Sequence, residues 1–208
     1  MNRIAVLSSG FGSNLQSLMD AQSAGVLGGE IVLVAANSPC VSIERAERAG
    51  IRTLTLPLDD LRDQAKRAQW EAQLADGIAA ANPDLVVLAG WMVILRGPML
   101  DRFGDRMINL HPALLPDDAS DIVITSRGPR PVFRGAHAVR DALAAKTDLA
   151  GASVHWVTAQ VDVGTVIDSV EVPILPDDTE ESLHARIGMV ERVLLPRVVA
   201  KIMDSLRQ

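Results

Sequence analysis

Two short polar segments of the chain carry the residue types that acyl transfer requires. One reads Asn-Leu-His-Pro from Asn109, and the other reads Val-Asp-Val-Gly around Asp162. An amide and an imidazole can stabilise an oxyanion, and an imidazole beside a carboxylate can move a proton. On an extended segment Asn109 and His111 point to the same side, and Pro112 keeps His111 out of a helix. Taken singly, each of the three polar residues also fits an ordinary turn or backbone-bonding role.

A glycine-containing segment near the N-terminus is a second candidate site. It reads Ser-Ser-Gly-Phe-Gly-Ser-Asn and lies between a predicted strand and a predicted helix. The start of such a helix offers free N–H groups and a positive dipole end, which favour phosphate. The third glycine of the dinucleotide fingerprint is missing and no acidic residue ends the second predicted strand, so a nicotinamide cofactor is disfavoured. A plain tight turn with Ser13 or Asn14 capping the helix is the alternative.

The elements that must position these segments alternate between strand and helix in the first half of the chain. Apolar runs predict strands at 4–8, 31–35, 52–56, 85–89 and 107–110. Helical spacing predicts helices at 14–24, 42–49 and 61–81. This order predicts an α/β fold with a doubly wound, mostly parallel sheet, in which ligands bind beyond the carboxyl ends of the strands.

The pattern changes after Pro116. Residues 117–132 are polar, contain glycine and proline and show no period, so we expect a long inserted surface loop there. The rest of the chain predicts a helix at 136–145, strands at 151–158 and 165–172, and a helix at 180–206 with a kink or break at Pro196. No linker divides the chain, so we expect one domain over residues 1–208.

Composition excludes several classes of protein. With 48% hydrophobic residues and a mean hydropathy of +0.19, the 208 residues are those of a globular domain. A net charge of -6 argues against nucleic acid as a partner. Cys40 is the single cysteine, so no internal disulfide forms and a cysteine-based metal site is not expected. No metal is expected as a cofactor. The chain shows no signal peptide and no apolar run of membrane-spanning length, which predicts a cytoplasmic enzyme without a membrane partner.

Together the motifs resemble the folate-dependent phosphoribosylglycinamide formyltransferases over nearly the whole chain. The shared element Asn-x-His-Pro-x-Leu-Leu-Pro belongs to the wider formyltransferase superfamily, while Ser-Asn-Leu-Gln after the glycines points to the glycinamide ribonucleotide branch or a close relative. The resemblance implies a formyltransferase-type Rossmann-like fold. It rests on Ser-Gly-Phe-Gly-Ser-Asn-Leu-Gln (9–16), Leu-Ala-Gly-Trp-Met with Ile-Leu (88–95), Asn-Leu-His-Pro-Ala-Leu-Leu-Pro (109–116), Gly-Ala-His with Asp-Ala-Leu (135–143), Gly-Ala-Ser-Val-His (151–155) and Val-Asp-x-Gly (161–164).

The resemblance implies transfer of a formyl group from the co-substrate 10-formyltetrahydrofolate to the amine of glycinamide ribonucleotide in purine biosynthesis. Asn109 and His111 match the residues that stabilise the oxyanion, and Asp162 matches the one that assists proton transfer. Residues matching the ribonucleotide site are Gly12, Ser13, Asn14, Gly188 and Glu191. Residues matching the folate site are Arg67, Met92, Val93, Ile94, Leu95, Asn109, Thr158, Ala159, Gln160, Val161 and Asp162.

Several positions depart from the family's pattern. The segment between Pro116 and Gly135 is much longer than usual. Other departures are Arg134 in place of a common proline, Val93 in place of a common arginine, Gly188 where a polar or basic residue often meets the substrate, and Val163 inside the Asp-x-Gly turn.

The inserted segment carries Arg127 and Arg130 and is followed by Arg134. One hypothesis is a lid that closes on the ribonucleotide and adds an arginine to its phosphate. The other is a tolerated surface insertion. The sequence also leaves open a related folate-dependent formyltransferase or formyltetrahydrofolate hydrolase with a different acceptor, a nucleotide-binding module without catalysis, and the oligomeric state, a homodimer included.

Overall fold

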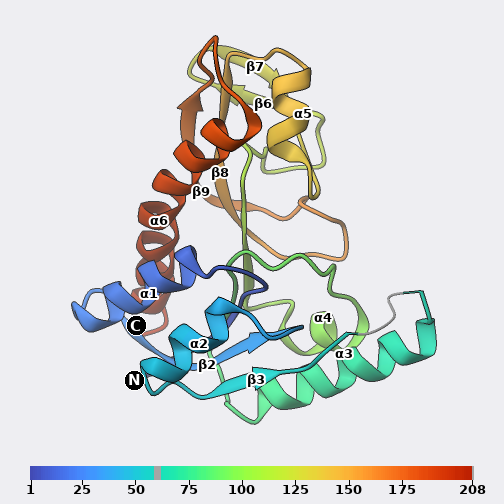
Figure 1. The fold of residues 1–208 in the computed structure, drawn as a ribbon, viewed down its shortest axis with the longest axis vertical. Helices are drawn as coiled ribbons and strands as arrows, with labels where there is room; N and C mark the ends of the chain where they lie inside the picture. The colour runs from blue at the N-terminus through green and yellow to red at the C-terminus, as the bar shows by residue number, and fades with distance from the viewer. Residues whose placement is uncertain (59–61, 208) are drawn as a thin grey trace.

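A seven-stranded sheet forms the centre of the molecule in the computed structural model, which describes residues 1–58 and 62–207 (Figure 1). The strand order is β3-β2-β1-β4-β5-β8-β9. The first five strands along the chain run parallel, and β8 and β9 add an antiparallel edge. The predicted doubly wound, mostly parallel sheet is therefore confirmed. The bounds are β1 (Asn2–Leu7), β2 (Gly29–Ala36), β3 (Thr53–Thr55), β4 (Leu85–Leu88), β5 (Met107–His111), β8 (Leu149–Trp156) and β9 (Val166–Pro173).

The central strands are apolar on both sides because each of their faces is covered by helices. On β1, Ile4 and Val6 contribute to one core cluster, while Ala5 and Leu7 contribute to the other. On β4 the same alternation places Leu85 and Val87 in the first cluster and Val86 and Leu88 in the second. Continuous apolar runs of this kind are expected for buried parallel strands.

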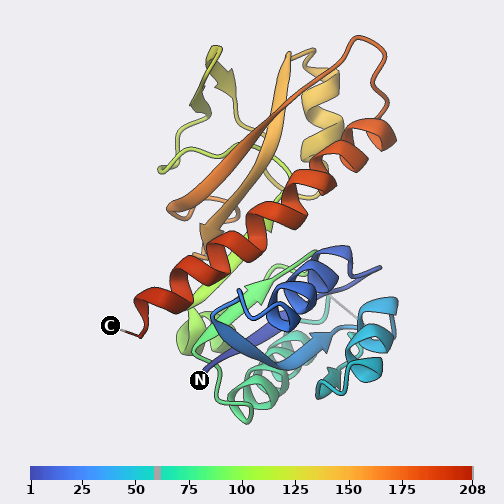
Figure 2. The ribbon, with the colours of Figure 1, turned by 90° about the vertical axis from the view of Figure 1, so that its left-hand side faces the viewer.

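Helices α1, α2 and α6 cover one face of the sheet, and α3 and α4 cover the other (Figures 1 and 2). The short helix α4 was not predicted, because its seven residues are too few to show a helical period. The predicted start of α3 at Leu61 lies outside the described residues. The bounds are α1 (Ser13–Ser23), α2 (Val41–Arg48), α3 (Gln64–Ala79), α4 (Gly97–Phe103), α5 (Ala138–Ala144) and α6 (Glu180–Ser205).

Helix α6 runs without interruption along the sheet, so the expected break at Pro196 is wrong (Figure 2). The proline costs a backbone hydrogen bond. Buried side chains on both sides of it, among them Leu195 and Val198, hold the helix in place by tertiary packing. No helix within the described ranges is long and apolar enough to cross a membrane.

The expected loop at 117–132 is instead a two-stranded hairpin of β6 (Ile122–Thr125) and β7 (Gly128–Pro131) at one end of the molecule (Figure 1). Val123 is buried against Leu114 and Leu149. Ion pairs from Arg127 and Arg130 to Asp148 fix the hairpin to the turn before β8. Its two prolines are tolerated because β7 pairs on one side only.

Candidate active site

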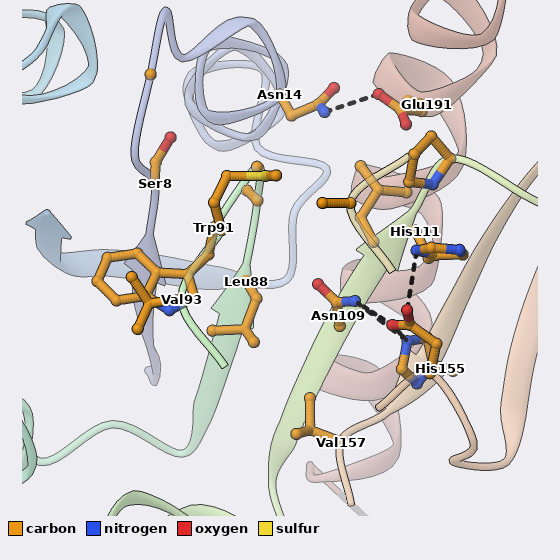
Figure 3. Close-up of a pocket in the computed structure, with 18 of the residues that line it drawn as sticks. Ser8, Asn14, Leu88, Trp91, Val93, Asn109, His111, His155, Val157 and Glu191 are labelled. Atoms are coloured by element: carbon orange, nitrogen blue, oxygen red, sulfur yellow. Dashed lines mark hydrogen bonds and ion pairs between the residues drawn. The ribbon is translucent and has the colours of Figure 1, made fainter. Parts of the chain in front are cut away.

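A cavity of about 520 Å³ opens at the carboxyl ends of β1, β4 and β5 (Figure 3). Its size is that of a typical small-molecule site, and its place is the one where open α/β sheets bind ligands. No residue of the 117–134 segment is among its described lining residues, so the lid hypothesis finds no support in this structure. The lining comes from residues 8, 10–14, 88–95, 109–112, 135–136, 155, 157–162, 184–185, 188 and 191–192.

Strand β5 aims two of the candidate catalytic side chains at the cavity. Ile108 and Leu110 belong to the core cluster on one face of the sheet, so Asn109 and His111 project from the opposite face. Both line the cavity, as the spacing of two residues predicted. The antiparallel neighbour β8 pairs His155 with Asn109 and thereby adds a second imidazole.

The turn between β8 and β9 returns Asp162 to these residues. Gly164 is required there, because a Cβ atom at this position would lie 1.6 Å from the carbonyl oxygen of Trp156. The backbone of Asp162 has a φ of 54°, an uncommon conformation for a residue with a side chain. The side chain is 8% exposed and lines the cavity.

The carboxylate of Asp162 is the centre of a polar network. Its Oδ2 accepts the N–H of Gly135 at 2.8 Å and lies 3.4 Å from Nδ1 of His111. Its Oδ1 lies 3.4 Å from Nδ2 of Asn109 and 3.5 Å from Nε2 of His155. Burial disfavours the charged carboxylate, but the contacts with His155, His111 and Gly135 outweigh it and lower the pKa of Asp162 to about 2.

His111 is held through both ring nitrogens. Nε2 lies 2.8 Å from the carbonyl oxygen of Phe133, so this nitrogen carries a hydrogen. Nδ1 then presents a lone pair to Asp162 in the neutral ring and a hydrogen in the imidazolium. Burial lowers the pKa of His111, while the Asp162 carboxylate and the Phe133 carbonyl oppose that shift. A charge on this ring is therefore costly unless a further negative charge lies beside it.

The amide of Asn109 is turned toward His155. Nδ1 of His155 lies 2.9 Å from the carbonyl oxygen of Trp156, so it donates there and leaves Nε2 of the neutral ring as an acceptor. Nδ2 of Asn109 donates to this Nε2 at 3.2 Å and to Asp162 at 3.4 Å. The amide oxygen points away from His155 into the cavity (Figure 3). As drawn, Asn109 presents an acceptor to the cavity and not the donor expected from the sequence.

The glycine segment forms the opposite end of the cavity. Gly12 is the N-cap of α1 with a φ of 78°, and a Cβ there would lie 2.7 Å from Oγ of Ser42. No side chain caps the helix, so the alternative in which Ser13 or Asn14 does so is wrong. The first hydrogen bond of the helix runs from the N–H of Gln16 to the carbonyl of Gly12, which leaves the preceding N–H groups for a ligand.

Helix α6 closes this end of the cavity with charged groups. Nδ2 of Asn14 donates to Glu191 at 3.0 Å, and Glu191 is only 7% exposed (Figure 3). Oδ1 of Asn14 is buried without a partner. Arg192 is the one lysine or arginine among the described lining residues, and it has no ion pair with any of them. Its Nη1 lies 3.4 Å from the position a Cβ would take at Gly188.

The wall predicted to hold folate is apolar and partly open. Met92 and Ile94 are 64% and 46% exposed, whereas Leu95 is buried. Arg67 is not among the lining residues. It lies behind the wall, where it bonds the carbonyl of Ile94 and forms an ion pair with the buried Glu71 at 3.3 Å.

The structure thus gathers all the predicted site residues except Arg67 around one cavity. Sequence reasoning did not assign Gly135, His155, His184 or Arg192 to it. The signal for His155 was its position on the strand that pairs with β5, and the signal for Arg192 was its spacing of four residues from Gly188 on one helix. Within the described residues no group of three or more histidine, cysteine or acidic side chains is arranged to hold a metal ion.

Comparison with known proteins agrees with this geometry. Residues 2–199 match the model of the formyl transferase family. Phosphoribosylglycinamide formyltransferase of Mycobacterium tuberculosis is 40% identical over 96% of this chain and 84% of its own length. The Schizosaccharomyces pombe enzyme of the same name is 37% identical over 97% of both chains.

Two further matches bear on length and fold. The chain spans only 14% of the trifunctional purine biosynthetic protein adenosine-3 of Drosophila melanogaster, to which it is 38% identical. Glycinamide ribonucleotide transformylase 1 of Symbiobacterium toebii superposes with a TM-score of 0.86 at 36% identity, over 99% of this chain and 89% of that one. The chain belongs to the formyl transferase family.

Proposed function

We propose that this protein transfers a formyl group from 10-formyltetrahydrofolate to the amine of glycinamide ribonucleotide, a step of purine biosynthesis. The observation that carries the proposal is a single cavity lined both by the unpaired N–H groups at the start of α1 and by the His111–Asp162 pair. One end suits a phosphate and the other suits acyl chemistry. The relatives that match over most of their length bear the name of this activity.

The ribonucleotide lies, in this proposal, between α1 and α6. Its phosphate accepts hydrogen bonds from the N–H groups of Ser13 and Asn14, and Arg192 supplies the positive charge. The carboxylate of Glu191 can only accept hydrogen bonds, so its second oxygen accepts one from a ribose hydroxyl. Oδ1 of Asn14, buried and unpaired, is a further acceptor for a donor of the substrate.

The folate lies along the wall formed by residues 92–95 and the turn at 158–162. The apolar side chains of Met92 and Ile94 cover the faces of the pterin, and backbone groups of both segments bond its polar edge. Arg67 supports this wall through the carbonyl of Ile94 and does not touch the ligand. Val93 lines the cavity in place of the arginine expected there, so a side-chain contact at this position is replaced by backbone contacts.

Transfer is direct. The amine of the ribonucleotide attacks the formyl carbon, the carbonyl oxygen becomes an oxyanion, and the bond to N10 of the folate then breaks as N10 takes a proton. A protein nucleophile is not needed, and Cys40 does not line the cavity. The cavity therefore acts by positioning the two substrates and by stabilising charge.

His111 supplies the positive charge in the transition state. Its Nδ1 lies 3.4 Å from Asp162, which is longer than the about 2.8 Å of a tight charge-assisted bond, so the imidazolium can share its Nδ1–H between Asp162 and a formyl oxygen beside it. The ring becomes easier to charge as the oxyanion develops beside it, which makes the stabilisation specific to the transition state. Asp162 holds the ring and a water molecule, which takes the proton that the amine loses and passes it to N10.

Asn109 joins this step by a half-turn of its amide. The turn brings Nδ2 into the cavity, where it donates to the oxyanion.

The test is an assay of the purified protein with both substrates, following the release of tetrahydrofolate and the formation of formylated ribonucleotide. We expect turnover that requires both compounds. Incubation with 10-formyltetrahydrofolate alone is the control for hydrolysis. Release of tetrahydrofolate at the same rate without the ribonucleotide would replace the proposal with a formyltetrahydrofolate hydrolase.

A further inference from the structure

Arg134 connects the β6–β7 hairpin to the catalytic turn through three hydrogen bonds. Its Nε donates to the carbonyl oxygen of Asp162 at 3.1 Å. Its Nη2 donates to the carbonyl of Ser120 at 2.7 Å, and its Nη1 to Oδ1 of Asp121 at 3.1 Å. The side chain is 20% exposed and does not line the cavity. It therefore reaches the site from behind, without touching a ligand.

The turn that carries Asp162 has few contacts of its own. Its described backbone bonds lie at its ends, where the N–H of Trp156 bonds Thr165 and the N–H of Val157 bonds Met107. Between them, the carbonyl of Asp162 has only Arg134 as a partner among the described residues. A φ of 54° at a residue with a side chain is an uncommon conformation that surrounding contacts must hold.

Three consecutive residues clamp the catalytic pair. The carbonyl of Phe133 bonds Nε2 of His111, Arg134 bonds the backbone of Asp162, and the N–H of Gly135 bonds its carboxylate. Only the middle one does so with a side chain. Its partners Ser120 and Asp121 lie at the base of the hairpin, where the N–H of Val132 also bonds the carbonyl of Asp121.

We infer that Arg134 is a positioning residue that holds Asp162 against His111, with the β6–β7 hairpin as its support. This inference rests on the proposed function for the reaction it serves. It gives the inserted segment a role different from the lid considered from the sequence, because the hairpin braces the site from outside. Arg134, at a position where the family commonly has proline, and the inserted hairpin therefore act together to hold Asp162.

Two substitutions separate position from charge. In Arg134→Ala both are lost, whereas Arg134→Lys keeps a cation that cannot span the three acceptors. We expect kcat to fall about tenfold or more in both variants, with the KM of either substrate changed less than about twofold, because a small displacement of a reacting group slows turnover without weakening binding. Thermal unfolding checks that both variants are folded.

The pH dependence distinguishes this role from a purely structural one. Burial lowers the pKa of His111; of the charged and titratable groups that face it, Asp162 raises the pKa, whereas His155 and Arg134 lower it. Because Asp162 has a larger influence than Arg134, releasing Asp162 in Arg134→Ala should shift the His111 titration, read by NMR, to lower pH. Arg134→Lys, which loses the same geometry, should shift the titration in the same direction. Arg130→Ala is the matched control, since Arg130 holds the same hairpin through Asp148 but lies away from the cavity, and it should keep wild-type kcat.

A readout without substrate keeps this inference separate from the proposed function. The N–H of Gly135, bonded to Asp162, should lose protection from hydrogen exchange in Arg134→Ala and keep it in Arg130→Ala. A kcat within twofold of wild type in Arg134→Ala overturns the inference. If the wild-type protein shows no turnover with these substrates, the proposed function fails, and unchanged exchange at Gly135 in Arg134→Ala then overturns the inference by itself.

Discussion

The two loops that border the cavity offer their polar groups in different ways. The glycine segment before α1 offers backbone N–H groups, which the start of the helix leaves free whatever the neighbouring side chains are. The turn before β9 offers one carboxylate, Asp162, whose position depends on Gly135, Arg134 and two histidines from other parts of the chain. The binding groups of the first loop are therefore set by local backbone structure, whereas the carboxylate of the second loop is positioned by tertiary contacts. Substitutions should therefore act on the two loops differently.

The largest effect is expected at His111, on the tertiary side of this comparison. His111→Ala removes the charge that stabilises the oxyanion and should lower kcat by about 10²- to 10³-fold. The KM of the ribonucleotide should stay within about twofold, because its phosphate is bound at the other loop. Steady-state kinetics with both substrates measure this. His137→Ala is the control, since His137 is exposed and does not line the cavity.

A different activity of His111→Ala would change the role assigned to the turn before β9. If kcat of His111→Ala stays close to that of wild type, the polar network around Asp162 is structural and the acyl chemistry lies elsewhere. Lost activity together with a lower melting temperature would call for the milder His111→Asn, which keeps a hydrogen-bonding side chain in the buried site.

Two glycines give a matched test of the loops themselves. Gly164→Ala places a methyl group 1.6 Å from a backbone carbonyl oxygen and cannot be accommodated without moving the turn. The free energy of unfolding should therefore fall by about 3 kcal/mol or more. Gly12→Ala meets Oγ of Ser42 at 2.7 Å and Cα of Ser42 at 3.1 Å, a milder overlap, and adopts a positive φ, for a cost of about 1–2 kcal/mol. Urea unfolding gives both values. Equal losses would show that the glycine segment is held as tightly as the turn before β9.

The same contrast explains what the sequence could predict. Local patterns sufficed for β4, an apolar run buried on both faces, and for the shared orientation of Asn109 and His111, which follows from the period of two. The free N–H groups before Gln16 also follow from the strand–glycine–helix order. Each of these features is set within about ten residues of the chain.

Features fixed by distant contacts escaped prediction. The hairpin was expected as a loop because Pro129 and Pro131 argue against a strand, yet β6 is held by burial of Val123 against Leu114 and the distant Leu149. Arg67 was expected at the ligand, but its partner proved to be the carbonyl of Ile94. That Arg134 bonds the backbone of Asp162 depends on a positive φ that no local pattern announces.

A smaller effect concerns stability in acid and again isolates the turn before β9. The pKa of Asp162 is about 2 in the folded protein against 3.8 as a usual value, so its charged form stabilises the fold above about pH 4. This contribution, about 2 kcal/mol, is lost as the pH falls from about 4 to about 2. Urea unfolding at pH 6 and pH 2.5 should show a smaller difference for Asp162→Asn than for wild type. An identical difference would mean that the carboxylate is not held by its neighbours in solution.

The smallest effect is expected at the ribonucleotide end of the cavity. There, Arg192 tests whether the glycine segment binds the phosphate by its backbone alone. Because it is the only unpaired lysine or arginine among the described lining residues, Arg192→Ala should raise the KM of the ribonucleotide about tenfold with kcat unchanged. Arg197→Ala on the same helix is the matched control, since Arg197 pairs with Asp168 and does not line the cavity. A KM within twofold of wild type would leave the phosphate to the N–H groups of α1 alone, which sharpens the contrast with the turn before β9. A tenfold rise in this KM instead shows that the side chain of Arg192 binds the phosphate together with the backbone N–H groups of α1.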